Sequence, residues 1–150
     1  VLAVDISSDT TIDTDSTEIH NITEDNVTLT NNADIIKASG GVNSTIFSDV
    51  AGTTIINNTG ATIGLTGTGD LTLNLQDIAT PTVINSGTIS SGDGQAIGIT
   101  KTTGAIITNN AGGVITARRS TIRCVSTCTN PTITNSGKII ATGILGIGTA

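Results

Sequence analysis

The sequence is almost free of aromatic residues: its 150 residues include one Phe and no Trp, Tyr or Met. Large aromatic side chains normally supply much of the buried area of a core. We therefore expect this chain to bury small β-branched side chains in thin, repeated layers. Disorder is the competing interpretation, because 30 residues are Thr and 18 are Gly. However, disordered segments combine low hydrophobicity with high net charge, whereas the mean hydropathy here is +0.22, so we expect a single folded domain.

Other absences narrow the class of protein further. No apolar stretch approaches the roughly 18 residues of a membrane-spanning helix, and no basic segment followed by an apolar run opens the chain. If the protein is secreted, Val1 is thus expected to be a processed start. The net charge of −6, the pI near 4.3 and the missing aromatic residues disfavour a nucleic-acid partner. Helix is also disfavoured, since Thr, Asn, Gly, Val and Ile predominate.

What the sequence does contain is an internal repeat. Five segments align: Leu29-Thr-Asn-Asn-Ala-Asp-Ile35, Ile56-Asn-Asn-Thr-Gly-Ala-Thr-Ile63, Ile84-Asn-Ser-Gly-Thr-Ile89, Ile107-Thr-Asn-Asn-Ala-Gly-Gly-Val-Ile115 and Ile133-Thr-Asn-Ser-Gly-Lys-Ile139. With Asn32, Asn58, Asn85, Asn110 and Asn135 as markers, the steps are 26, 27, 25 and 25 residues. A second apolar pair follows most markers, and its members are Thr45 and Phe47, Leu71 and Leu73, Ile97 and Ile99, and Ile122 and Cys124.

This period predicts an all-β, single-domain parallel β-solenoid of about six coils with about 25 residues each, stacked about 4.8 Å apart. Residues 1–26 are expected to form an acidic N-terminal strand and a first coil or cap, and residues 27–150 the repeats. Asn and Gly tolerate the positive φ of tight corners, and stacked Asn side chains can form a hydrogen-bonded ladder. The alternative is a β-sandwich with regularly spaced turns, which repetition of one motif disfavours.

The pattern Ile-x-Asn-x-Gly-x-Ile, followed by a small-residue loop and a second strand, resembles the passenger repeats of bacterial autotransporters and filamentous-haemagglutinin-like surface proteins. The resemblance covers roughly residues 27–150. It implies a right-handed parallel β-helix at the cell surface, and it says little about activity, because such passengers are mostly stalks that carry separate functional loops.

The charges are divided along the chain. Residues 1–34 carry a net charge of −8 and residues 94–150 a net charge of +5. The acidic residues of the first segment are Asp5, Asp9, Asp13, Asp15, Glu18, Glu24, Asp25 and Asp34, and the basic residues of the second are Lys101, Arg118, Arg119, Arg123 and Lys138. Because sequence order is axial order in a solenoid, the rod should have a negative and a positive end. The division fits either a solvated acidic tip or head-to-tail association that builds a filament.

The apolar segments at the two ends of the chain favour head-to-tail association, because natural solenoids usually carry polar caps at their ends. We expect the assembly interface to comprise Val1, Leu2, Val4, Ile6, Arg118, Arg119, Arg123, Ile144, Leu145 and Ile147. One specific form is strand addition, in which residues 1–6 pair with a neighbouring copy.

Two cysteines, Cys124 and Cys128, lie four residues apart. A turn between them would allow a disulfide, and a disulfide would indicate an oxidising, extracellular setting. A free thiol pair or a metal site is the alternative, for which His20 is the remaining soft ligand. Sequons at Asn21, Asn26, Asn43 and Asn57 permit N-glycosylation.

Catalysis is not expected. Parallel β-helix hydrolases need converging carboxylates, whereas Asp70, Asp77 and Asp93 show no such spacing, and His20 is expected on the surface of a strand. Asp5, Asp9, Asp13 and Asp15 offer oxygen ligands of the kind that Ca²⁺ binds, so a Ca²⁺ site is considered for this segment. An ice-binding face would require Thr-x-Thr in register on successive coils, and the Thr28/Thr30, Thr66/Thr68 and Thr132/Thr134 pairs do not establish that register.

The sequence therefore predicts a secreted, non-enzymatic structural subunit of an extracellular or cell-surface filament, which assembles head-to-tail with copies of itself. The alternative is an adhesin passenger fragment that binds a host or carbohydrate surface through its loops.

Overall fold

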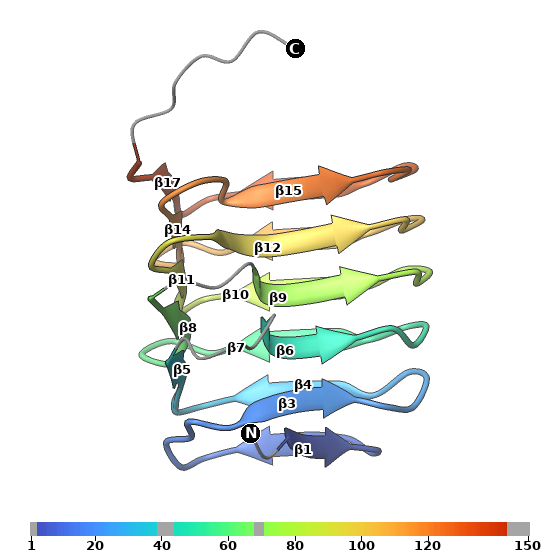
Figure 1. Cartoon of the computed structure of the whole chain (residues 1–150), viewed down its shortest axis with the longest axis horizontal. Helices are drawn as coiled ribbons and strands as arrows, with labels where there is room; N and C mark the ends of the chain where they lie inside the picture. Colours follow the sequence, from blue (N-terminus) through green and yellow to red (C-terminus); the bar gives the residue numbers. More distant parts are fainter. Residues whose placement is uncertain (1–2, 39–43, 68–70, 144–150) are drawn as a thin grey trace, which may run out of the picture.

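The protein is a β-solenoid made of three parallel sheets (Figure 1). The computed structural model describes residues 3–38, 44–67 and 71–143, and this part contains strands and turns but no helix. In particular, it holds no helix of the length and apolarity needed to cross a membrane. The prediction of an all-β parallel solenoid is therefore confirmed.

We name the sheets A, B and C in the order in which the chain visits them. Sheet A contains β1 (Ala3–Ile6), β3 (Ile19–Ile22), β6 (Ser44–Ser48), β9 (Leu71–Gln76), β12 (Gln95–Thr100) and β15 (Ile122–Val125). Sheet B contains β2 (Thr10–Ile12), β4 (Thr28–Asn31), β7 (Thr54–Asn57), β10 (Thr82–Asn85), β13 (Ile106–Asn109) and β16 (Thr132–Asn135). Sheet C contains β5 (Asp34–Ala38), β8 (Thr62–Thr66), β11 (Thr88–Ser91), β14 (Val114–Ala117) and β17 (Lys138–Ala141).

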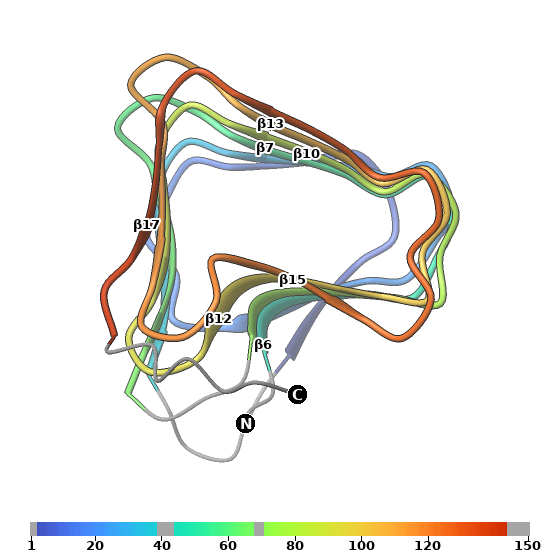
Figure 2. The ribbon, with the colours of Figure 1, turned by 90° about the horizontal axis from the view of Figure 1, so that it is seen from above.

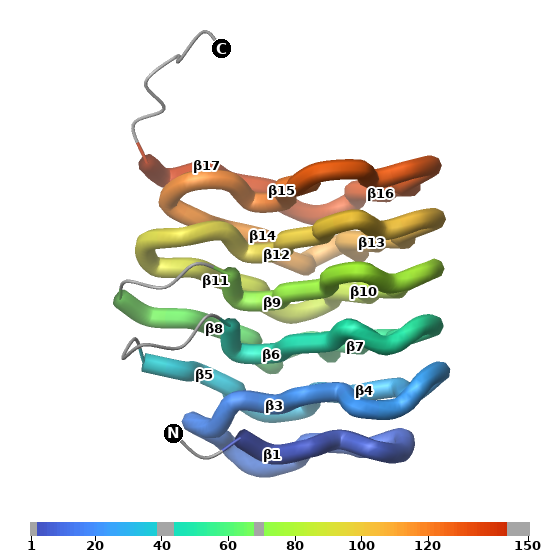
Figure 3. Tube along the Cα trace, turned by 45° about the vertical axis from the view of Figure 1, so that its right-hand side comes forward, coloured from blue at the N-terminus to red at the C-terminus, as the bar shows by residue number. Residues whose placement is uncertain are grey.

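One strand from each sheet makes a level, and the levels stack along the rod axis (Figure 3). Viewed from above, a level is roughly triangular, with one sheet on each side (Figure 2). The chain runs counter-clockwise from sheet A through B to C as it rises toward the viewer, so the winding is right-handed (Figures 1 and 2).

The number of coils differs slightly from the prediction. Sheets A and B have six strands but sheet C has five, so the first level lacks a regular third strand. A single bridge between Ser16 and Ile35 stands in its place. Residues 3–6 were expected to be available to a neighbouring copy, but they pair with β3 of the same chain, Ile6 opposite Ile22. The edge of β1 that pairs with β3 is therefore not available to a neighbouring copy.

The core consists of aliphatic columns that run through the levels. In sheet B the column of Leu29, Ile55, Val83 and Ile107 pairs residue by residue, and no member is more than 2 % exposed. In sheet C, Ile35, Ile63, Ile89 and Ile115 are each 0 % exposed. Branched aliphatic side chains pack well on such pleated surfaces, so the core needs no aromatic residue.

The inward register was one residue wrong at β6. Ile46, rather than Thr45 or Phe47, stacks between His20 and Leu73, and it is fully buried. Phe47 lies on the outer face, in the column of Asn21 and Asn74.

Residues with a positive φ lie at the corner between sheets A and B at successive levels. Their φ values are 60° at Asn26, 67° at Gly52, 49° at Thr80, 66° at Gly104 and 51° at Asn130. The amide of each of the first four donates to a backbone carbonyl of the next level, as from Asn26 N to Ala51 O (2.8 Å). Asn and Gly supply four of these five residues. The predicted positive φ of the marker asparagines is wrong, because it occurs at none of Asn32, Asn58, Asn85, Asn110 and Asn135.

The turn from sheet B to sheet C alternates in length. It has two residues after β4, β10 and β16 but four residues after β7 and β13. The longer turns form loops at their corner without disturbing the strands above and below, because the register on either side is kept.

Neighbouring residues of β13 allow a matched test of the core. We expect Ile107→Ala to lower the free energy of unfolding by about 2–5 kcal/mol, because it opens a cavity in a buried column. Ile106→Ala, at a side chain 42 % exposed on the outer face, should cost far less. Urea denaturation followed by circular dichroism measures both, and equal losses would contradict this assignment of faces.

Candidate interface at the ends of the solenoid

A ladder of buried asparagines marks the corner between sheets B and C. The Nδ2 of Asn31 donates to Oδ1 of Asn57 at 2.9 Å, and the contacts Asn57–Asn85, Asn85–Asn109 and Asn109–Asn135 follow, each at 2.8 Å. The predicted ladder thus exists, but three of the five markers were wrong. The first Asn of each Asn-Asn pair faces inward, so the steps are 26, 28, 24 and 26 residues.

Each inner Asn also closes its own turn. Asn57 Nδ2 lies 3.3 Å from the carbonyl of Ala61 and 3.0 Å from that of Thr88 on the next level. Asn57 is 0 % exposed, so its amide nitrogen is not accessible as a glycosylation acceptor in the folded chain. Of the other sequons, Asn26 is exposed, Asn21 is half-buried on the outer face, and Asn43 lies outside the described residues.

The second residue of each pair forms an outer ladder. Asn58 donates to Asn32 at 2.6 Å, and Asn110 donates to the hydroxyl of Ser86 at 2.9 Å. Asn32 in turn donates to the carboxylate of Asp13 at 2.7 Å. Because these groups are near water, they are expected to contribute less than the inner ladder.

The last level, formed by β15, β16 and β17, exposes inward residues whose counterparts at the four levels below are buried. Ile133 continues the column of Ile107 but is 51 % exposed, and Ile139 continues the column of Ile115 but is 36 % exposed. Neither was among the expected interface residues. Their signal was present in the repeat itself, since each aligns with the inward Ile of the preceding segments.

At the first level, Val4 is 38 % exposed whereas Ile6 is 4 % exposed. Of the predicted interface, only Val4, Ile6, Arg118, Arg119 and Arg123 can be placed. The remaining members, Val1, Leu2, Ile144, Leu145 and Ile147, lie outside the described residues.

Carboxylates of the first level accept hydrogen bonds from the second. Asp9 accepts from the amide of Thr28 (2.8 Å), and Asp15 from that of Asp34 (3.1 Å). Asp5, Asp9, Asp13 and Asp15, all of which lie in the described part, do not form a group of three or more that could hold a metal ion. Within residues 3–38, 44–67 and 71–143, no group of three or more His, Cys, Asp or Glu side chains could hold a metal ion.

Two of the five C-terminal basic residues are paired within the chain. Lys101 Nζ lies 3.5 Å from Asp77, and Arg118 contacts Asp93, in each case across one level. Arg119, Arg123 and Lys138 have no ion-pair partner in the described part of the chain. Asp77 and Asp93 therefore each contact a basic side chain rather than each other. Asp70 lies outside the described residues.

Cys124 and Cys128 form a disulfide, with their Cα atoms 6.1 Å apart, so this prediction is confirmed. The bond closes the turn that follows β15, at the corner between sheets A and B. It gives the last level a covalent constraint of its own.

His20 was expected on the surface, but it points into the core. It is 4 % exposed, it stacks between Val4 and Ile46, and its Nδ1 has no hydrogen-bond partner. Burial lowers the pKa of His20 below 6.5, although the backbone and charge of Glu18 act in the opposite direction. Because the side chains of β3 alternate between its two faces, the position of His20 in the strand places it in the core despite its polarity.

The outer face of sheet B carries an interrupted threonine array. Thr28, Thr54, Thr82 and Thr132 share one column, which Ile106 breaks, and a parallel column is broken by Ile56 and Ile84. Thr-x-Thr is therefore complete at β4 and β16 but not at the strands between them.

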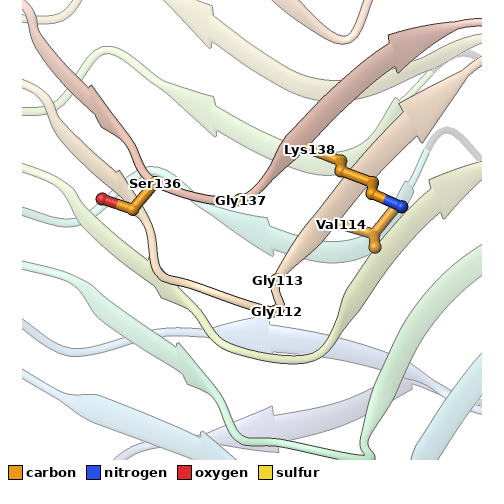
Figure 4. Close-up of a pocket in the computed structure, with 6 residues that line it drawn as sticks. All are labelled: Gly112, Gly113, Val114, Ser136, Gly137 and Lys138. Atoms are coloured by element: carbon orange, nitrogen blue, oxygen red, sulfur yellow. The ribbon is translucent and has the colours of Figure 1, made fainter.

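A shallow pocket lies beside the last two turns between sheets B and C (Figure 4). It measures about 290 Å³ and is lined by Gly112, Gly113, Val114, Ser136, Gly137 and Lys138. Lys138 is the one titratable side chain in this lining, so the pocket brings together no acid–base pair.

The inner and outer ladders allow a matched comparison of neighbouring residues. We expect Asn57→Ala to destabilise the fold by roughly 2 kcal/mol or more, because it leaves buried partners on two levels unsatisfied. Asn58→Ala removes an exposed hydrogen bond and should cost less than 1 kcal/mol or so. Thermal and urea unfolding measure both changes, and the reverse order would contradict the assignment of Asn57 to the inner ladder.

His20 should make stability depend on pH. Well above pH 6.5 the imidazole is neutral in both states, so it contributes no pH dependence there. As the pH falls below that value the unfolded chain takes up the proton first, because the folded-state pKa is lowered, and stability decreases. We expect this loss to begin as the pH falls through about 6.5 in the wild type but not in His20→Leu. The unfolding free energy measures it, and identical slopes in the two proteins would contradict it.

Comparison with known proteins adds no identity to this geometry. No protein-family model matches the chain, and no curated protein or solved structure matches it either. The two ends of the solenoid are the surfaces whose exposed residues suggest a function.

Proposed function

We propose that the protein is a non-enzymatic structural subunit of an extracellular or cell-surface filament, which grows by head-to-tail stacking of identical solenoids. The last level of one copy would be covered by the first level of the next. Filament growth follows because a contact between two different surfaces of the same molecule does not close on itself.

The observation that carries this proposal is the exposure of two core columns at the last level. The side chains below Ile133 and Ile139, those of Ile107 and Ile115, are 2 % and 0 % exposed. A further coil would bury both isoleucines, because a solenoid coil completes its core only against its neighbours. The edges of β15, β16 and β17 also offer backbone groups to a further strand.

The charges favour a copy of the same chain as that further coil. The first level carries exposed carboxylates, among them Asp5 and Asp15, and the last carries Arg123 and Lys138. Two first levels would repel each other, as would two last levels, whereas a first and a last level attract. Opposite ends therefore select the head-to-tail orientation.

The disulfide supports the expected location, because such bonds persist mainly in oxidising compartments. The resemblance to surface-protein passenger repeats is consistent with it. The absence of catalysis is proposed because Asp77 and Asp93 are each engaged with a basic side chain.

Negative-stain electron microscopy of the purified chain at low and high salt tests the proposal. Uniform fibres are expected, with an axial repeat of about 29 Å, six level spacings. The rate of fibre growth should differ between low salt and 0.5 M salt, because the Debye length at 0.5 M is only about 4 Å and the charges at the two ends are screened. Isolated short rods at every concentration would overturn the proposal and favour the adhesin alternative, in which loops bind a host or carbohydrate surface.

A variant of the last level tests which surface drives assembly. We expect Ile133→Lys with Ile139→Lys to raise the critical concentration for fibres at least about tenfold, because two charges replace the apolar contact. Ile106→Lys is the control, since Ile106 is comparably exposed but lies on the side of the rod. Sedimentation of fibres measures both, and equal effects of the two changes would place the contact elsewhere.

A further inference from the structure

The column that ends in Arg123 begins with a carboxylate. Asp5 pairs with Asn21 on β3, and the pairing continues level by level to Gly98 and finally to Arg123 on β15. Asp5 and Arg123 are both exposed on the outer face of sheet A. They are the first and last residues of the same column.

A second column, in sheet C, has the same arrangement. It ends in Lys138 on β17, which pairs with Val114, and descends to Asp34 on β5. Below Asp34 lies Asp15, because Ser16 bridges Ile35 and the carboxylate of Asp15 accepts the amide of Asp34 at 3.1 Å. Lys138 and Asp15 are exposed.

We infer that the two charge pairs set the register between copies, an inference that rests on the proposed head-to-tail assembly. The next copy continues each column without a shift, so that Arg123 faces Asp5 of the next copy and Lys138 faces its Asp15. The strands then lie about 4.8 Å apart, which brings each pair of charged groups into contact distance.

The unshifted register is the one that satisfies both pairs together. A shift by one residue would turn the outward side chains inward and place Arg123 opposite Val4 or Ile6. A shift by two would place it opposite Ala3 or Ser7, neither of which carries a charge. The unshifted register also sets Ile122 over Val4 and Cys124 over Ile6 on the inner face of sheet A.

The internal ion pairs explain why these bases are available. Lys101 and Arg118 already contact Asp77 and Asp93 at the corners. Arg123 and Lys138 lie instead on strands of the last level and have no carboxylate partner among the residues described. A neighbouring first level supplies one to each.

Carbodiimide cross-linking of wild-type fibres tests the register directly, because the reagent joins a lysine to a carboxylate in contact with it. Within one chain Lys138 and Asp15 lie five level spacings apart, about 24 Å, so a cross-link between them comes from two copies. Mass spectrometry should identify Lys138–Asp15 as the main linkage in oligomers. Linkage of Lys138 to a different carboxylate of the neighbour would overturn the register.

Charge reversal gives a second readout. Arg123→Glu should raise the critical concentration for fibres about tenfold, since a like-charge pair replaces an attractive one. Adding Asp5→Arg to it should restore assembly toward the wild-type level. Arg119→Glu is the control, because it changes net charge equally but lies at a corner outside both columns, and thermal unfolding shows that each variant folds.

The two proposals fail in different ways. Wild-type chains that form no fibres would overturn the proposed function, and the register with it. Fibres whose assembly is not restored by Asp5→Arg, and which give no Lys138–Asp15 cross-link, would overturn the register alone.

Discussion

The structure depends on one constraint, which is that every level stacks on the one below without a shift in register. The buried asparagine ladder enforces this constraint. Each amide must meet the next at 2.8–2.9 Å, and a slip by one residue would turn the amides outward and the outer polar residues inward. The aliphatic columns tolerate small displacements, because dispersion contacts are not directional. Hydrogen bonds between buried amides are directional and costly to lose, so they fix the register that the aliphatic core follows.

Because the levels stack in register, the residues exposed at each end of the rod are the first or last members of its columns. A residue in the interior has a neighbour above and below, whereas a residue on the first or last level has one neighbour only. The same inward isoleucine is therefore a core residue at β14 and a surface residue at β17.

The fold class and the disulfide were accessible from sequence, because the first depends on a period and the second on a local spacing, whereas the right-handed winding was implied only by the resemblance to passenger repeats. The face of a given residue was harder to predict. It depends on the neighbouring level, and the alternation of two- and four-residue turns shifts the numbering between levels. Asn32 was taken for Asn31 for this reason. Asn85 and Asn135 held the missing signal, since each is followed by Ser and leaves one candidate for the inner column. The burial of His20 was harder to predict, because its polarity favours the surface of the strand whereas its position in the alternation of β3 favours the core.

A junction between copies would lack the interaction that holds the interior together. In the unshifted register Asn135 would lie over Ile12, which occupies the position below Asn31 and offers no amide oxygen. The ladder is thus interrupted where one chain meets the next, and the inner columns there mix Ile133 with Thr10 and Ile139 with Ser16. The contact between the first two levels of one chain already lacks the ladder, so such a junction is weaker than the levels that the asparagines join, and fibres should come apart before those levels unfold. It also needs another means of fixing the register, and charge pairs on two different sheets serve that purpose, because together they specify position along both strands.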